Sequence, residues 1–268
     1  MSGATSATSD AISDVIARRT LAPNGVLRVA INVGNSVLAQ RADAGGVQGI
    51  SVDLATKLAE RLQVRVAIQV YDAAGKVVEA LKADEWDLAF LAIDPKRSEE
   101  IAFTPAYVVI EGAYMVREAA PYHSSADVDG NKVRIAVGAG SAYELFLSRN
   151  LSHARIEKSA TGAEAFNAFV NQELEALAGV RQVVERLAAE HAGYRVLNDS
   201  FMSIHQALAV PKRSIAALPY LTTFIEEMKA AGEIATALAR SGQSAAKVAP
   251  AADAAADAAT DMASKLQR

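Results

Sequence analysis

The sequence predicts an α/β protein with two lobes that are joined by two extended crossings. Between residues 27 and 92, three strand patterns alternate with two helix patterns, and this order implies a parallel sheet with right-handed crossovers. A new strand, turn and helix pattern begins at Val133, so a second α/β lobe is expected. Two long β-rich segments, 107–116 and 201–210, are positioned to carry the chain to that lobe and back.

Composition limits the functions that are open to the chain. Its 268 residues suffice for two lobes of ordinary size, and 51% hydrophobic with 22% charged residues is typical of globular proteins. The net charge of −4 argues against general nucleic-acid binding. The absence of cysteine excludes disulfides and thiolate metal sites. Because no apolar stretch approaches the roughly 18 residues of a membrane-spanning helix, we expect no membrane insertion.

Residues 1–23 are predicted to form a polar N-terminal lead-in segment that precedes the first lobe. Ser9 and Asp10 are candidates to cap a short helix that runs through Arg19. The segment shows no basic region followed by the roughly 7–15 apolar residues of a secretory signal, since its two arginines follow the weakly apolar part. This pattern predicts a cytosolic protein, with a periplasmic location as the alternative.

The first lobe is expected to span residues 24–112 together with 207–242. Its strands are indicated by alternating or continuous β-branched and apolar residues, and its helices by apolar residues three and four positions apart. Ser51 is the expected cap of the first of these helices. The predicted elements are strands at 27–31, 64–70 and 88–92, and helices at 51–62, 76–82 and 219–231.

The second lobe is expected to span residues 113–206. Beyond Gly242 the sequence becomes rich in alanine, and residues 243–268 are predicted to be a mobile or helical tail, with an oligomerisation helix as the rival interpretation. The elements predicted for the second lobe are strands at 133–137, 154–158, 174–178 and 194–197, and helices at 143–149, 163–171 and 180–190.

Two strand ends of the first lobe carry polar residues that suit a ligand. The strand 88–92 breaks before Asp94 and Pro95, and Arg97 follows one short turn later. Ligands of open α/β sheets bind beyond the carboxyl ends of strands, where a helix start supplies free backbone N–H groups. The guanidinium of Arg97 would add a planar set of donors for a carboxylate. Asn32 and Asn35 follow the end of the first strand.

The turn at 138–141, with the sequence Gly-Ala-Gly-Ser, is a candidate anion site at a helix start. It lacks the third glycine and the later acidic residue of a dinucleotide-binding motif, and no Lys-Ser/Thr follows as in a P-loop. No cofactor is therefore expected. No metal site is expected either, because metal-like spacing is absent from His123, His153, His191 and His205.

Taken together, the chain resembles the type II periplasmic solute-binding proteins, in the branch that binds polar amino acids for ABC transporters. The resemblance covers roughly residues 24–242 and implies a two-lobed α/β clamshell with two hinge strands that closes over a small-molecule ligand. It implies a membrane ABC transporter as partner if the protein is exported, and otherwise an unknown protein partner. The segments that carry the resemblance are residues 27–32, 49–64, 79–107, 133–144 and 207–234. The second of these contains the pair Asp53-Leu54, and the third contains Trp86-Asp87, Arg97, Phe103-Thr104 and Tyr107.

The resemblance also assigns roles to individual residues. Arg97 is expected to pair with the ligand carboxylate, and Ala92 to offer backbone groups. Asp94 stands where the family usually has Thr, and it either caps the turn before Pro95 or meets a ligand donor. The residues expected on the other side of the carboxylate are Gly140, Ser141 and Ala142.

One departure from the family pattern bears on the ligand. Amino-acid binders normally hold the ligand ammonium with an acidic residue, and counting from Glu175 that position is Val180. Arg181 and Gln182 follow and add donors and an amide, if they face the ligand rather than a solvated helix surface. The ligand is therefore expected to be a small polar or carboxylate-bearing metabolite other than a standard α-amino acid.

Two further functions remain open beside a non-catalytic binding protein. Cyclohexadienyl and arogenate dehydratases resemble these binding proteins and need a carboxylic acid in the cleft to protonate a leaving hydroxyl. An intracellular metabolite sensor is the other alternative, prompted by the missing signal. No acidic pair is compelling enough to assign catalytic residues, although the candidate acids are Asp94, Glu111, Glu144 and Glu175.

Overall fold

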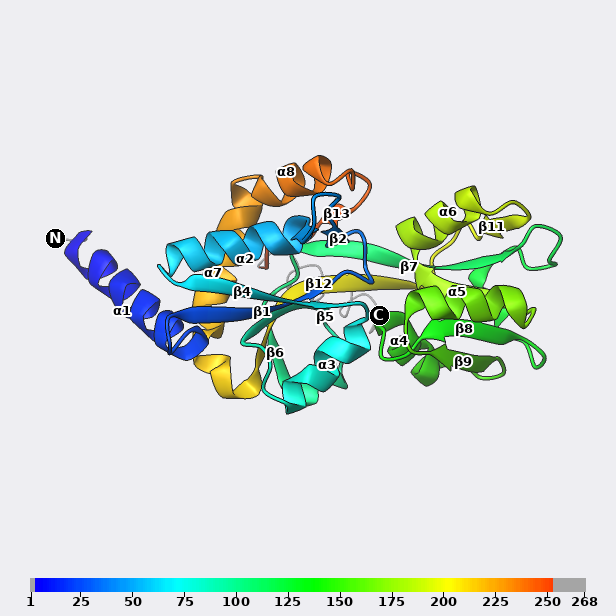
Figure 1. The fold of residues 1–268 in the computed structure, drawn as a ribbon, viewed down its shortest axis with the longest axis horizontal. Coiled ribbons are helices and arrows are strands. Elements are labelled where there is room, and N and C mark those ends of the chain that lie inside the picture. The colour runs from blue at the N-terminus through cyan, green and yellow to red at the C-terminus, as the bar shows by residue number, and fades with distance from the viewer. Residues whose placement is uncertain (1–2, 253–268) are drawn as a thin grey trace, which may run out of the picture.

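The computed structural model describes residues 3–252 and confirms an α/β fold of two lobes. The lobes are joined by two long strands, β7 (Val108–Arg117) and β12 (Met202–Pro211), which pair antiparallel in the middle of an 11-stranded mixed sheet (Figure 1). These are the two extended crossings expected from the sequence. Since both strands extend through the junction, the lobe boundaries after residues 112 and 206 remain a prediction.

The first lobe is built on parallel strands beside β12. Its strands are β1 (Val26–Asn32), β4 (Arg65–Tyr71), β5 (Leu88–Ala92) and β6 (Ile101–Phe103), with a small hairpin of β2 (Gln40–Arg41) and β3 (Val47–Gln48). Its helices are α2 (Ile50–Arg61), α3 (Ala74–Lys82), α7 (Leu218–Ala230) and α8 (Glu233–Arg240), with short 3-10 helices at Arg97–Glu99 and Lys212–Ala217. The order β4-β1-β5-β12 places the carboxyl ends of β1 and β5 side by side at the junction with the second lobe.

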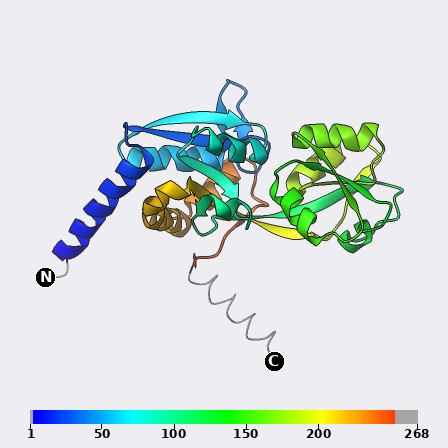
Figure 2. The same cartoon turned by 90° about the horizontal axis from the view of Figure 1, so that it is seen from below.

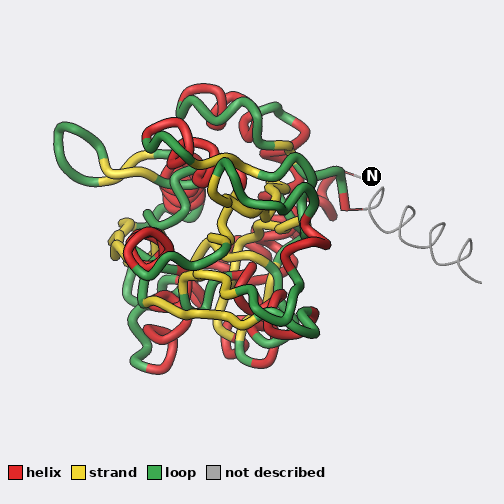
Figure 3. The backbone as a smooth tube through the Cα atoms, turned by 90° about the vertical axis from the view of Figure 1, so that its right-hand side faces the viewer, coloured by secondary structure: helices red, strands yellow, loops and turns green. Residues whose placement is uncertain are grey.

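The second lobe repeats the pattern on the other side of β7. Its strands are β8 (Arg134–Gly138), β9 (Arg155–Ser159), β10 (Ala176–Val180) and β11 (Tyr194–Val196), and its helices are α4 (Ala142–Asn150), α5 (Gly162–Asn171), α6 (Arg181–Glu190) and a 3-10 helix at Ser125–Val128. The order is β7-β10-β8-β9, with β8 parallel to both of its neighbours. In the end-on view of Figure 3, most strands run through the middle and helices lie outside them.

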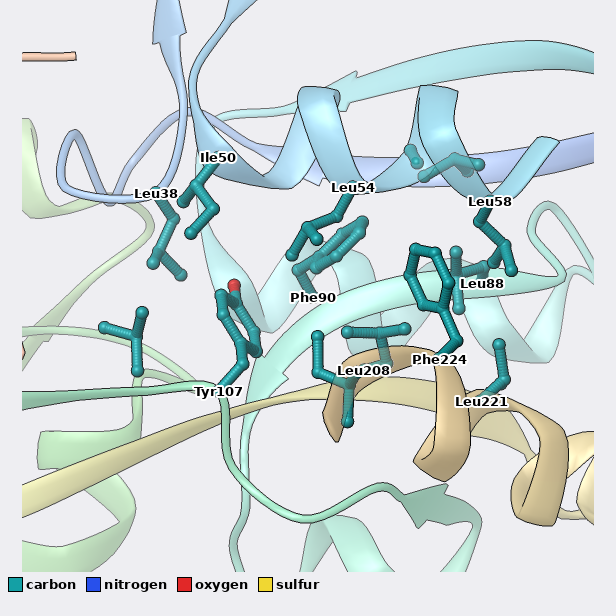
Figure 4. Close-up of a cluster of buried hydrophobic side chains, with 14 of the residues drawn as sticks. Leu38, Ile50, Leu54, Leu58, Leu88, Phe90, Tyr107, Leu208, Leu221 and Phe224 are labelled. Atoms are coloured by element: carbon teal, nitrogen blue, oxygen red, sulfur yellow. The ribbon is translucent and has the colours of Figure 1, made fainter. Parts of the chain in front are cut away.

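The largest hydrophobic cluster among the described residues joins α2, α7, β5 and β12 (Figure 4). Phe90 of β5 meets Tyr107 edge to face, with ring centroids 6.1 Å apart. Each side chain of this size contributes about 1.5–3 kcal/mol when fully buried. The cluster therefore fixes β5, whose end carries the first candidate site residues. The other labelled residues are Leu38, Ile50, Leu54, Leu58, Leu88, Leu208, Leu221 and Phe224.

Two expected helix starts differ from the structure. The N-terminal helix α1 (Gly3–Leu21) begins earlier than Ser9, and it projects from the first lobe (Figure 2), held where Ala17 and Leu21 are buried. The start of α2 is capped by Gly49 rather than by Ser51. Gly49 has a φ of 120°, and a Cβ there would lie 2.6 Å from the carbonyl oxygen of Leu38, so this backbone position requires glycine.

The C-terminal part differs from its expected course in two places. The helix predicted to end at Gly232 is followed by α8, because Gly232 turns the chain with a φ of 72° and a new helix begins directly after it. Within the segment 243–268, expected to be mobile or helical, the strand β13 (Lys247–Val248) pairs with β7 and Ala249 is buried. Residues 253–268 lie outside the described part.

Candidate functional site

The end of β5 forms the first wall of the cleft between the lobes. After Ala92 the chain turns at Asp94, whose Oδ1 accepts a hydrogen bond from the backbone N–H of Lys96 at 2.9 Å. This side-chain-to-backbone bond closes the turn in the way that aspartate before proline commonly does. The 3-10 helix that begins at Arg97 follows directly, and it directs the Arg97 side chain back along β5 toward the cleft.

Arg97 is a buried cation between the lobes. Its side chain is 4% exposed and donates to the carbonyl oxygen of Ala92 at 2.9 Å and to that of Gly140, in the second lobe, at 2.8 Å. Its Nε has no hydrogen-bond partner among the described residues, and Arg97 lines the cavity. Nη1 and Nη2 each carry a second N–H beyond these two bonds, so the guanidinium keeps donors that a ligand could use.

Burial governs the electrostatics of this group. Loss of hydration lowers the pKa of Arg97 from its ordinary value to about 10, and the nearby carboxylates of Asp94 and Glu144 oppose part of that shift. The guanidinium remains charged at neutral pH. A buried charge is costly without a partner of opposite charge, so a bound anion would be strongly favoured here.

The second wall is the start of α4. Ser141 is its N-cap, and its Oγ accepts from the backbone N–H of Glu144 at 3.1 Å. The Glu144 carboxylate in turn accepts from the N–H of Gly140 at 3.1 Å and pairs with Lys158 at 2.7 Å. These contacts hold the turn at 138–141 in place opposite Arg97. Ser141 retains a hydroxyl hydrogen that can donate toward the cleft.

The lobes contact each other at two further points beside Arg97. Asp94 Oδ2 pairs with Arg149 of α4 at 2.7 Å across the lobe junction. Gly75 of α3 lies so close to Gly140 that a Cβ on Gly140 would be 2.6 Å from the Cα of Gly75. The structure therefore shows the lobes in contact, with the cavity between them.

The cavity has a volume of about 460 Å³, which is in the range typical of small-molecule sites. Residues at the starts of α3, α4 and α5, and the residue before α6, all line it, so the positive ends of four helix dipoles face it. The apolar part of its lining includes Leu38, Phe90, Tyr143, Val180, Val183 and Ile204. The site is suited to an anionic group attached to an apolar body.

Neutral amides supply much of the remaining polarity. Asn32 and Asn35 line the cavity, and each uses its side-chain oxygen to accept a backbone N–H bond, from Gly34 at 3.0 Å and from Val37 at 3.3 Å. Their amide nitrogens therefore remain as donors. Gln206 of β12 also lines the cavity, is 5% exposed, and forms no side-chain hydrogen bond within residues 3–252.

Six of the ten predicted site residues line the cavity and four do not. Arg181 turns away toward the hinge, where it pairs with Glu111 of β7 at 2.8 Å. The reason is that Val180, at the end of β10, takes the cleft-facing position, and the first residue of α6 then points elsewhere. The residues that line the cavity are Asn32, Asn35, Ala92, Arg97, Ser141 and Ala142, and those outside it are Asp94, Gly140, Arg181 and Gln182.

Acidic groups are scarce in this lining. Among the described residues, Asp72 is the only carboxylate that lines the cavity, and it pairs with Lys76 at 2.8 Å. The hydrogen bond from Lys76 lowers the pKa of Asp72, so this group is an anion at neutral pH. Val180, at the position where the resemblance leads one to expect an ammonium-binding acid, lines the cavity with an apolar side chain. The described lining therefore offers few charged acceptors for a ligand cation.

We next consider metal-binding clusters and membrane-spanning helices among the described residues. Within the part of the chain that the structure describes, histidine and acidic side chains form no group of three that could hold a metal ion. In residues 3–252 no helix has both the length and the apolar character that crossing a bilayer requires.

The family model for bacterial extracellular solute-binding proteins, family 3, matches residues 27–243. The chain belongs to this family. The match spans both lobes and both hinge strands, so it covers all the elements that form the cleft. No curated protein matches the chain.

Solved structures of solute-binding proteins share the fold. The L-cysteine solute receptor of Neisseria gonorrhoeae is 21% identical with a TM-score of 0.73, covering 84% of this chain and 92% of that one. An arginine-bound amino-acid ABC transporter protein from Streptococcus pneumoniae is 21% identical with a TM-score of 0.72, covering 87% and 99%. An ancestral amino-acid-binding protein, described as a precursor of cyclohexadienyl dehydratase, is 23% identical with a TM-score of 0.69, covering 85% and 98%. At these identities the likeness extends to the fold alone.

Several polar cavity residues were not predicted from the sequence, among them Gln206, Asp72 and Thr161. Gln206 lies within a segment that was predicted only as a hinge. Asp72 follows β4, and no site residue was predicted at the end of that strand. Thr161 is the N-cap of α5, and its Oγ1 accepts from the N–H of Glu164 at 3.1 Å. Asp72 and Thr161 could have been found, because both follow predicted strands of the parallel parts of the sheet.

Proposed function

We propose that the chain binds a small carboxylate-bearing metabolite between its lobes, and that this ligand is not a standard α-amino acid. The observation that carries the proposal is Arg97, a cationic residue that is 4% exposed, lines the cavity and has no carboxylate partner among the described residues. A ligand carboxylate would pair with this charge and accept hydrogen bonds from its free donors.

The hydrogen-bonding character of the lining supports the second half of the proposal. An α-ammonium group brings three donors and needs acceptors around it. The cavity instead offers the donors of Arg97, Arg186, Asn32 and Asn35, and Asp72, the single lining carboxylate among the described residues, is already paired with Lys76. An acceptor-rich ligand without an ammonium group matches these side chains better.

We infer that the protein is a binding protein rather than a dehydratase-like lyase. A lyase of that kind needs a cleft acid that is protonated when it reacts. The four acids considered for that role do not line the cavity, and each is held in an ion pair with a basic side chain. The pairs are Asp94–Arg149, Glu111–Arg181, Glu144–Lys158 and Glu175–Arg134.

The partner and the cellular location are further proposals. The family is described as extracellular, and the Streptococcus pneumoniae relative is a component of an ABC transporter, so a membrane transporter is the partner that we propose for an exported form. This description does not support the cytosolic location expected from the sequence, nor a role as an intracellular sensor. Fractionation of native cells decides the matter: recovery from the cytosol would contradict a transporter partner.

Calorimetric titration tests the proposed ligand class. The probes are 4-methylpentanoate and its 2-amino derivative, leucine, which differ only in the ammonium group. We expect leucine to bind no more tightly than 4-methylpentanoate, and Arg97→Gln to weaken binding of the acid by at least about 30-fold. The control is Arg155→Gln, at an exposed arginine on β9 that does not line the cavity. Tighter binding of leucine, or full affinity in Arg97→Gln, would refute the proposal.

A further inference from the structure

Gln206 is a buried amide with no assigned role. It lies on the hinge strand β12, is 5% exposed and lines the cavity. Its backbone carbonyl accepts from the N–H of Tyr107 at 2.8 Å, but its side chain has no hydrogen-bond partner within residues 3–252. Buried amides are nearly always hydrogen-bonded, because an unpaired one loses hydration without compensation. The amide is therefore available to a molecule in the cavity.

The register of the sheet puts this amide beside the carboxylate site. Gln206 is paired directly with Ala92 of β5 in the antiparallel ladder. Directly opposed residues have Cα atoms about 4.5–5.5 Å apart and side chains on the same face of the sheet. The carbonyl oxygen of Ala92 in turn accepts from Arg97 at 2.9 Å. A ligand carboxylate on Arg97 would thus have its neighbouring atoms within reach of Gln206.

The chemistry of the amide limits what that neighbouring group can be. A glutamine amide is neutral and offers one acceptor oxygen and two N–H donors. A hydroxyl can both donate to the amide oxygen and accept from the amide nitrogen, and a carbonyl oxygen can accept from the nitrogen. An ammonium has three N–H donors but would meet only one acceptor on Gln206, and the neighbouring amide nitrogens of Asn32 and Asn35 are donors as well.

We propose that Gln206 determines specificity by hydrogen-bonding a neutral oxygen on the carbon next to the ligand carboxylate. The ligand class is then a 2-oxo or 2-hydroxy acid, with an apolar remainder that packs against walls such as Leu38, Val180 and Ile204. This inference rests on the proposed function, since it takes the carboxylate on Arg97 as its starting point. It adds the second polar group of the ligand and names the residue that recognises it.

Titration with one carbon skeleton tests the inference. The probes are 4-methylpentanoate and its 2-oxo and 2-hydroxy derivatives, and the proteins are wild type, Gln206→Met and Gln206→Glu. We expect an oxygen at carbon 2 to tighten wild-type binding about ten-fold, and Gln206→Met, which keeps the length of the side chain but not its amide, to remove that gain. Gln206→Glu should disfavour the 2-oxo acid most, because two acceptors would then face each other.

A matched control lies on the same strand. Ser203→Ala changes an exposed residue of β12 outside the cavity and should leave all affinities unchanged. If wild type binds the three acids equally, or if the gain persists in both Gln206 variants, the inference fails. Failure of the proposed function has a different signature, namely full affinity in Arg97→Gln or preference for leucine. If none of the three acids binds to wild type, the inference is also refuted.

Discussion

Removal of the ion pair between Asp94 and Arg149 is expected to weaken ligand binding without altering the cavity. Arg149→Gln deletes a charge on α4 that contacts Asp94 at 2.7 Å across the lobe junction. Neither residue lines the cavity, so any effect on affinity must come from the equilibrium between separated and closed lobes. The substitution keeps a polar side chain of nearly the same reach.

The geometry sets the size of the effect. The Asp94 side chain is 4% exposed, but that of Arg149 is 42% exposed, so the pair lies between a buried and a surface ion pair. Exposed pairs contribute about 0.2–1 kcal/mol, and the burial of one partner places this pair near 1 kcal/mol. Asp94 keeps its bond from Lys96, so it is not left as an unpaired buried charge. A loss of about 1 kcal/mol in the closed form weakens binding by about five-fold.

Calorimetry with the tightest-binding of the test acids, combined with small-angle scattering, measures both consequences. We expect a Kd for Arg149→Gln that is higher by up to about five-fold at low salt, a smaller difference at high salt, and a larger radius of gyration without ligand to the extent that the unliganded lobes of wild type are closed. Arg134→Gln is the matched control, because its 40% exposed side chain pairs with Glu175 within the second lobe. An unchanged Kd for Arg149→Gln, or an equal loss for Arg134→Gln, would refute the reasoning.

Two other substitutions give independent tests. Gly75→Ala would place a Cβ 2.6 Å from the carbonyl oxygen of Ala139 in the other lobe, so the substitution should hinder lobe closure and weaken ligand binding in titrations. The unliganded fold should remain at least as stable, because alanine favours helices. Undiminished affinity in Gly75→Ala would contradict the expected effect on closure. The hydrogen bond from Arg134 lowers the pKa of Glu175 below its ordinary value of 4.5, so the pair stabilises the fold above that pH and the contribution is lost as the pH falls. In urea titrations from pH 7 to 3, Glu175→Gln should therefore lose less stability than wild type, and identical pH profiles would argue against this role.

Much of the fold was accessible from the sequence because its elements carry their own local signals. Strands β1, β5 and β8 end within about a residue of the predicted positions, since each is a short β-branched or apolar run that ends at a turn. The strand-end argument indicated Asn32, because strand ends at one edge of a parallel sheet line a common cleft, whereas Ala92 was indicated by the family resemblance.

The parts that were missed depend on tertiary geometry. Arg181 and Gln206 show the difference: Arg181 directly follows a strand end but turns to Glu111, whereas Gln206 lies inside a hinge strand and faces the cavity through its register with Ala92. No local pattern specifies register between β12 and β5. The pairing of β13 with β7 is likewise a long-range contact that alanine-rich composition could not indicate.

The central claim is that Arg97 holds the carboxylate of the ligand, and a cycle that changes both partners tests it most directly. Wild type and Arg97→Gln are each titrated with 4-methylpentanoate and with 4-methylpentanamide, which has the same shape without the charge. If the guanidinium pairs with the carboxylate, the two changes are coupled by about 2 kcal/mol or more, and the amide loses little when Arg97 is replaced. A coupling near zero would contradict the claim.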